Sequence, residues 1–185
     1  MSVDESGRRS YLPGAWFGIF GEAAAVLLPP TEKRRVAALW ELLDDGADFD
    51  EVLDALIATG LRDLPGFLLV ADTDDATRVV VRGAARATFE TADGPVEVGA
   101  AGAGTWVERT VTGVTATVLE VPGADDDTDA PAPAEPMTVL SGLVRVSRVE
   151  TPAPDRTTAA ADDAPGSASP AGAAVAAAGA AGAAG

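Results

Sequence analysis

The residues that could do chemistry in this chain are mostly carboxylates. Seven acidic residues fall between positions 41 and 54, namely Glu41, Asp44, Asp45, Asp48, Asp50, Glu51 and Asp54. Clustered carboxylates can serve as general acids and bases. Most of these fall on the polar side of two predicted helices, however, so we interpret them as a solvated face that can steer a basic partner. Glu41, Asp44 and Asp45 are the candidate contact residues on this face.

The three tryptophans form the second group of candidate residues. Trp16, Trp40 and Trp106 belong to three different predicted elements, which is compatible with an aromatic-lined pocket for a small molecule. Core packing explains them as well, because Trp40 lies in the apolar stripe of its helix and Trp106 lies among alternating strand residues. We retain Trp16 and Trp106 as candidate pocket residues.

Two further motifs do not have the spacing that a nucleotide-binding loop or a calcium-binding loop requires. The glycine-rich stretch at residues 99–104 fits neither the dinucleotide fingerprint nor the Walker pattern, and a predicted strand follows it rather than a helix. The aspartates within residues 125–129 alternate like the first ligands of a calcium loop, but Ala130 and Pro136 stand where that loop needs glycine and glutamate. The sequence therefore predicts no metal site and no cofactor.

The residue inventory excludes several kinds of catalysis. The chain has no cysteine and no histidine, and Lys33 and Tyr11 are its only lysine and tyrosine. Thiolate metal sites and nucleophiles, histidine zinc ligands and the usual base of a serine triad are therefore absent. We expect a protein that is not an enzyme.

The charge balance narrows the choice of partners. With 29 acidic and 13 basic side chains, the formal net charge is -16. Such a chain repels phosphate backbones and anionic lipid surfaces. We expect protein partners rather than nucleic acid or a membrane, and the sequence does not fix an oligomeric state.

The N-terminal segment begins with paired arginines ahead of an apolar stretch, which raises the alternative of an export signal. Gly7 and Pro13 depart from the twin-arginine motif, and Glu22 interrupts the apolar region. We predict instead a first hairpin of two strands, at residues 15–20 and 24–28.

Helical periodicity follows this hairpin. Thr31 is the expected N-cap of a first helix, and Gly46 is placed to end it. Asp48 and Glu51 form the acidic relative of a capping box at the start of a second helix, which Gly60 ends. The apolar stripe of the first helix consists of Val36, Leu39, Trp40 and Leu43.

The remaining periodicity is that of strands. Residues 66–83, 85–99 and 104–121 each hold two β-rich runs around a turn, and we interpret each pair as a hairpin. Residues 137–150 alternate as a last strand or strand pair. The predicted fold class is α+β: an antiparallel β-sheet or sandwich-like domain with an inserted pair of short amphipathic helices, followed by a disordered tail.

Composition sets the expected boundaries. We predict a disordered lead at residues 1–10 and an α+β domain at 11–149, with an acidic, proline-rich loop at 122–136. Residues 150–185 are almost entirely Ala, Gly, Pro, Ser, Thr and Asp, so they form a disordered linker or tail.

The order of these elements carries a family resemblance. The segments "YLPGAWFGIFGEAAAVLLPP", "VAALWELLDDGADFDEVLDALIATGLRDLPGFLLV", "TRVVVRGAARATFE" and "GTWVERTV" resemble the N-terminal region of actinobacterial proteins that contain a forkhead-associated (FHA) domain. The resemblance covers residues 11–149. In that family a Pro/Ala-rich linker and the FHA domain follow this region.

The resemblance implies a cytoplasmic setting in Ser/Thr-kinase signalling. It gives no phosphothreonine-binding residues, because the β-sandwich that carries them is not in this chain, which has no asparagine at all. We expect a non-enzymatic protein-interaction or regulatory module, as the N-terminal part of a longer FHA protein or as a naturally short relative. The alternative is a small-molecule-binding domain, at the outside a metal-free, cupin-like one.

Overall fold

The computed structural model describes residues 8–58, 60, 64–73, 75–100, 106–123 and 135–152. All of them belong to the first of two compact units, Met1–Pro154, and the second unit, Asp155–Gly185, lies outside the described residues. Most of the predicted lead, the greater part of the predicted acidic loop and nearly all of the predicted tail also lie outside them.

The described chain consists mainly of strands. The strands are β1 (Arg9–Phe20), β2 (Ala25–Leu28), β3 (Phe67–Asp72), β4 (Ala76–Arg82), β5 (Arg86–Thr91), β6 (Gly94–Gly99), β7 (Val107–Thr112), β8 (Val114–Glu120), β9 (Met137–Val139) and β10 (Gly142–Thr151). The helices are the short 3-10 helix η2 (Pro30–Glu32), α1 (Lys33–Asp44) and α2 (Phe49–Ile57).

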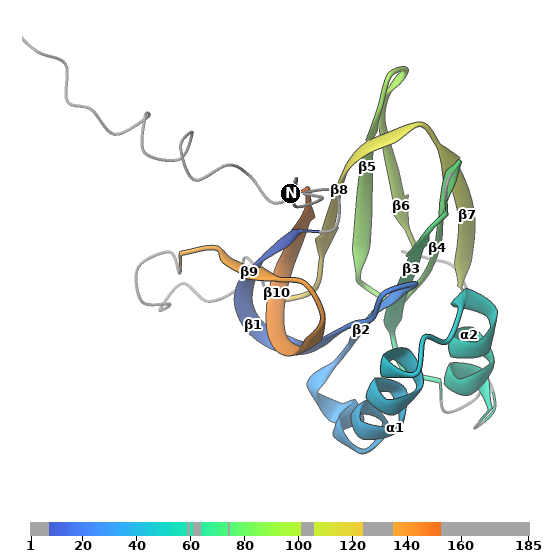
Figure 1. Cartoon of the computed structure of the whole chain (residues 1–185), viewed down its shortest axis with the longest axis vertical. Helices are drawn as coiled ribbons and strands as arrows, with labels where there is room; N and C mark the ends of the chain where they lie inside the picture. The colour runs from blue at the N-terminus through green and yellow to red at the C-terminus, as the bar shows by residue number, and fades with distance from the viewer. Residues whose placement is uncertain are drawn as a thin grey trace, which may run out of the picture. The chain divides into compact units, whose positions relative to one another are not determined.

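These strands form one antiparallel sheet that curls until it is nearly closed (Figure 1). Its order is β6-β5-β8-β10-β1-β2-β3-β4-β7, and β9 pairs with β1 beside this path. The predicted α+β class is therefore confirmed, with the two helices inserted between β2 and β3. The predicted hairpins β1–β2, β3–β4 and β5–β6 are present.

Strand β1 holds the sheet together because it pairs with three other strands. It begins at Arg9, slightly before the predicted domain start at residue 11. Its first residues pair with β9 and its last residues with β2, while β10 runs along its other edge. The β1–β10 register shifts between Leu12 and Trp16. A Cβ at Gly14 would lie 2.5 Å from the carbonyl oxygen of Val146, so this close approach of two backbones requires glycine.

The predicted hairpin over residues 104–121 is wrong. β7 pairs with β4, whereas β8 pairs with β5 and β10, so the two consecutive strands do not pair with each other. Only Gly113 separates them, in the left-handed conformation with φ +65°. Because β7 is an edge strand and β8 lies near the opposite edge, this one-residue link is possible only where the sheet curls back on itself.

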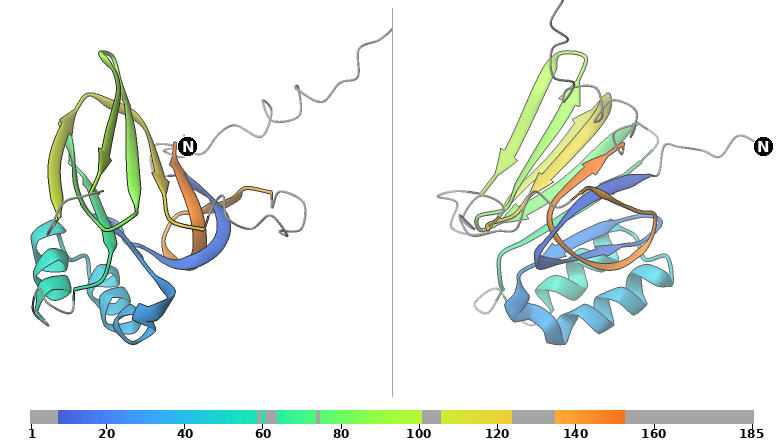
Figure 2. Two further views of the ribbon diagram at one scale, coloured as in Figure 1. Left: turned by 180° about the vertical axis from the view of Figure 1, so that it is seen from behind. Right: turned by 90° about the vertical axis from the view of Figure 1, so that its left-hand side faces the viewer.

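The predicted strand pair at residues 137–150 is present in an unexpected form. β9 and β10 do not pair with each other but lie on opposite edges of β1. Their connection therefore passes around β1, as the orange ribbon does in Figure 2. We call residues 137–143 the β9–β10 arch.

The helix signals were correct with one exception. Asp48 accepts from the backbone N–H groups of Asp50 and Glu51, and the Glu51 carboxylate accepts from the N–H of Asp48, which completes the predicted capping box. Gly46 follows α1 with φ +84° and donates its N–H to Leu43. Thr31 does not cap α1, however, because the chain first makes the turn η2 and no side-chain hydrogen bond caps the helix.

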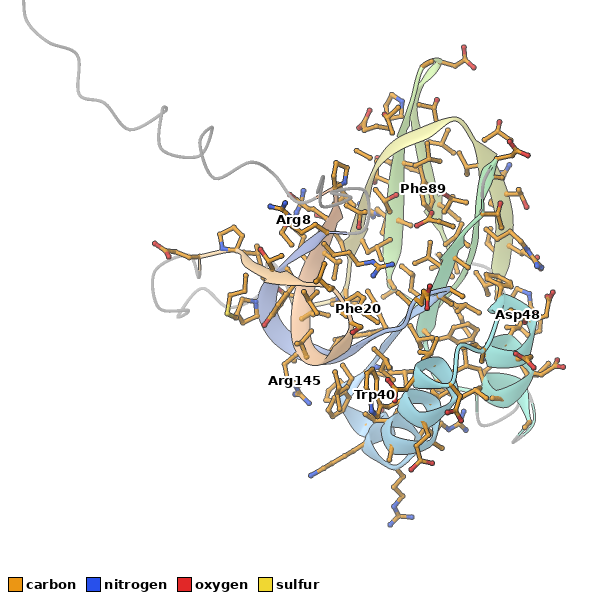
Figure 3. All side chains as sticks on the ribbon, in the orientation of Figure 1. Arg8, Phe20, Trp40, Asp48, Phe89 and Arg145 are labelled. Atoms are coloured by element: carbon orange, nitrogen blue, oxygen red, sulfur yellow. The ribbon has the colours of Figure 1, made fainter. Side chains whose placement is uncertain are left out.

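Two hydrophobic clusters lie on the two faces of the sheet. The inner cluster fills the interior of the curl, where Phe20 and Phe89 are fully buried (Figure 3). The helix-side cluster lies between the outer face of β1–β4 and the helices α1 and α2 (Figure 2). Strands β2 and β3 are buried on both faces, and they are accordingly almost entirely apolar.

Candidate functional site

The predicted acidic contact residues lie together on α1 and at its C-terminal end. Glu41, Asp44 and Asp45 are all exposed, and the spacing of three and four residues places them on one side of the helix. Among the described residues, none of their side chains makes a hydrogen bond or an ion pair. This arrangement is that of a solvated carboxylate face, and its role as a contact surface stays a prediction.

The structure does not bring the two candidate tryptophans together. Trp16 is 7% exposed and packs in the inner cluster, whereas Trp106 packs at the margin of the helix-side cluster. The sheet therefore separates them. Neither tryptophan lines either of the two cavities described below.

One of the other carboxylates joins a network that the sequence did not indicate. The guanidinium of Arg78 lies 4.1 Å from the ring centre of Phe49, donates to both carboxylate oxygens of Asp50 at 3.2 Å, and donates to Glu108 at 3.1 Å. Its hydrogen bonds to these two carboxylates raise the pKa of Arg78 above its ordinary value. The network ties α2 to β4 and β7, which is a structural role.

The exposed apolar side chains concentrate on the β9–β10 arch. Among the described residues, only Met137, Leu140 and Leu143 are large hydrophobic side chains that are exposed, at 43%, 67% and 46%. Single exposed apolar residues are ordinary, whereas large contiguous apolar patches are typical of interaction sites. All three lie within one short connection, so the concentration is local.

Contacts to β1 fix the position of the arch. Arg9 donates from Nη1 to the carbonyl oxygen of Leu140 at 3.1 Å, and the hydroxyl of Tyr11 lies 3.8 Å from the sulfur of Met137. Burial lowers the pKa of Arg9 below its ordinary value, and the negative charge of Asp72 opposes this shift. The arch is therefore an element attached at both ends rather than a free loop.

A cation lies beside the arch. Arg145 follows Leu143 on the outer face of β10, and its guanidinium lies 4.3 Å from the ring centre of Phe17 on β1. Figure 3 shows Arg145 at the end of the sheet where α1 carries Trp40. In the described part of the chain no carboxylate pairs with Arg145. Stacked arginines next to apolar side chains are frequent anchors of protein interfaces.

A cleft lies at one end of the curled sheet. It has a volume of about 540 Å³ and is bordered by the β3–β4 turn, the first residues of β8 and the end of β10. Its polar lining consists of Asp72, Thr73, Asp75, Thr77, Thr115, Thr117 and Thr151. A smaller cavity beside it shares Asp72, Thr117 and Thr151 and reaches Arg9 and Phe20.

Several of the polar groups in this cleft already make hydrogen bonds within the domain. Thr77 is buried and donates to Oδ1 of Asp72 at 2.6 Å, while Thr73 donates to the carbonyl oxygen of Ala76 at 2.7 Å within the β3–β4 turn. Thr115 donates to the carbonyl oxygen of Glu90. The cleft therefore presents hydroxyl and carboxylate oxygens as hydrogen-bonding groups.

Strand alternation in the sequence bears on the arch, whereas no sequence pattern indicates the cleft. Residues 137–150 alternate in the sequence, and in the structure Val144, Val146 and Val149 pack in or against the inner cluster whereas Leu143 and Arg145 are exposed. The cleft is built from three segments far apart in the sequence, and only their tertiary arrangement creates it.

The described residues contain neither a candidate metal centre nor a candidate membrane-spanning helix. No group of three or more Asp or Glu side chains there could hold a metal ion. No helix in the same residues has the length and apolar character needed to cross a membrane.

The comparisons with known proteins found no relatives. A scan against protein-family models, a search of curated proteins and a search of solved structures each gave no match.

Proposed function

We propose that this chain is a non-enzymatic protein-interaction or regulatory module whose contact surface is the β9–β10 arch. The observation that carries the proposal is the concentration of exposed Met137, Leu140 and Leu143 on one element that is fixed to β1. Burying such side chains against a partner removes apolar area from water and stabilises a complex. Arg145 supplies a stacked cation at the margin of the same surface.

The proposed cellular setting of this module rests on the resemblance of the sequence to the N-terminal region of FHA-domain proteins. We propose that the chain acts in the cytoplasm as the N-terminal part of an FHA-containing signalling protein, with its partner in Ser/Thr-kinase signalling. The DNA that follows codon 185 tests this part. An FHA-coding segment in frame supports it, and an immediate stop codon contradicts it.

The interaction itself is tested by a double substitution on the arch. Leu140→Asp with Leu143→Asp removes apolar side chains that are largely exposed, so it should change the free energy of unfolding by less than about 0.5 kcal/mol per site. The matched control is Thr110→Asp with Thr112→Asp, which adds the same charge at exposed positions of β7.

The measurement is affinity capture from lysate of the source organism, followed by calorimetry with the purified partner. We expect a protein that the native chain and the control retain and the arch variant does not, with binding weakened at least about tenfold by loss of the apolar contacts. Equal retention by all three chains, or no partner for any of them, would refute the proposal.

A further inference from the structure

The cleft at the end of the sheet lies beside a stretch of strand edge that is unpaired within the described residues. β10 pairs with β8 no further than Thr151, which lies opposite Thr117, whereas β5 pairs with β8 as far as Val114. Within the described residues, which end at Pro152, the backbone of residues 114–116 therefore pairs with a strand on one side only. These residues form one wall of the cleft.

The β3–β4 turn, which also lines the cleft, carries negative charge. Asp72 and Asp75 lie at the β3–β4 turn, are both exposed, and line the cleft. Asp72 uses Oδ1 to accept from Thr77, and among the described residues its Oδ2 has no hydrogen-bond partner. Among the described residues that line this cleft none is cationic, and Arg9 lines the smaller cavity, which shares Asp72.

The turn that presents these carboxylates is locally rigid. The backbone N–H of Thr73 donates to the carbonyl oxygen of Ala76 at 2.8 Å, and the hydroxyl of Thr73 also donates to that oxygen. The backbone N–H of Ala76 donates back to the same hydroxyl at 3.2 Å. A preorganised turn loses little conformational entropy when a ligand binds, which favours affinity.

We propose that this cleft binds an extended peptide segment that carries a lysine or arginine side chain. The segment pairs with the backbone edge of residues 114–116 as an added strand, and its basic side chain reaches Asp72 and Asp75. An exposed strand edge offers unpaired N–H and C=O groups to such a segment. The hydroxyls of Thr117 and Thr151 on the floor of the cleft supply further hydrogen-bonding groups.

Charge selects the class of peptide. The described lining of the cleft holds two carboxylates and no cation, and the whole chain carries a net charge of -16, which attracts basic segments and repels acidic ones. This site shares no residue with the β9–β10 arch. The inference therefore stands independently of the function proposed above.

Fluorescence anisotropy with the full chain tests the proposal. The probe is a short fluorescein-labelled peptide in which valine and lysine alternate, and the matched probe has glutamate in place of lysine. We expect the lysine peptide to bind and the glutamate peptide not to bind. Asp72→Asn with Asp75→Asn should weaken the lysine peptide about tenfold, since it removes both charges but keeps an acceptor for Thr77.

The control variant is Glu97→Gln with Glu135→Gln, which removes the same charge from exposed positions outside the cleft and should leave the affinity within about twofold. Backbone amide shifts on addition of the lysine peptide should map to residues 114–116. Equal weakening by both variants, equal binding of both peptides, shifts confined to the arch, or no binding of the lysine peptide would each overturn the proposal.

Discussion

Strands β1–β4 carry apolar side chains on both faces, and the two faces are covered in different ways. The inner face is covered by the rest of the same sheet as it curls, so the inner cluster includes side chains from all ten strands. The outer face is covered by two helices of 12 and 9 residues that the chain inserts between β2 and β3. The inner cluster thus depends on all ten strands, whereas the helix-side cluster depends on a local insertion.

This difference predicts unequal losses of stability when a substitution opens a cavity in one cluster or the other. A cavity in the inner cluster weakens packing among strands that depend on each other for closure, so the whole unit should lose stability together. A cavity on the helix side weakens the attachment of short helices, which can open while the sheet remains folded. Substitutions on the two sides measure how far the clusters are independent.

The largest effect is expected from Phe89→Ala in the inner cluster. Phe89 is fully buried on β5, and its removal should lower the free energy of unfolding by about 3–5 kcal/mol. Urea unfolding followed by far-ultraviolet circular dichroism and by tryptophan fluorescence gives this value. We expect both signals to change in one transition. A loss below about 1 kcal/mol would contradict a shared inner core.

A smaller effect is expected from Leu56→Ala on α2. Leu56 is also fully buried, but its helix has only nine residues and can shift to fill part of the space, so we expect a loss of about 2 kcal/mol. Amide hydrogen exchange should show faster opening in α2 than in β2 and β3. If all three elements exchange at the same increased rate, the helix-side cluster is not a separate unit.

The smallest effect is expected from Asp48→Ala, which removes the N-cap of α2. Asp48 accepts from two backbone N–H groups at 3.0 and 2.9 Å, and losing this cap should cost about 1 kcal/mol in thermal or urea unfolding. Asp45→Ala is the control, because Asp45 lies at the C-terminal end of α1, where a negative charge is unfavourable. Equal losses from both substitutions would mean that the capping box contributes nothing.

Local features of the fold were predictable from the sequence because local chemistry decides them. The capping box at Asp48 and Glu51 and the glycine after α1 satisfy backbone groups within a few residues, so their patterns are visible in the sequence. The turn at Gly94 between β5 and β6 is also local. Thr31 is the exception, because it lies within the short 3-10 helix η2, which begins at Pro30.

The candidate site was less predictable. Outward-facing Leu143 and Arg145 follow from strand alternation, but whether they are exposed depends on how far the helices extend over the sheet. Nothing in the sequence separates Trp16 from Trp106 as candidate pocket residues. Only the sheet between them shows that they cannot share a pocket. Asp72 and Thr151 meet at one cleft although they are distant in the chain.

Residue types and local patterns were enough to give the chemical inventory, the two helices, the capping box of α2, and the hairpins β1–β2, β3–β4 and β5–β6. Three features depend on the folded arrangement: β7 and β8 pair with different strands on either side of Gly113, the arch passes around β1, and a cleft remains beside β8. The reason is that a strand of alternating residues fits many partners equally well, because its local pattern fixes which side chains face the core but not which edge it pairs with. The closure of the whole sheet makes that choice.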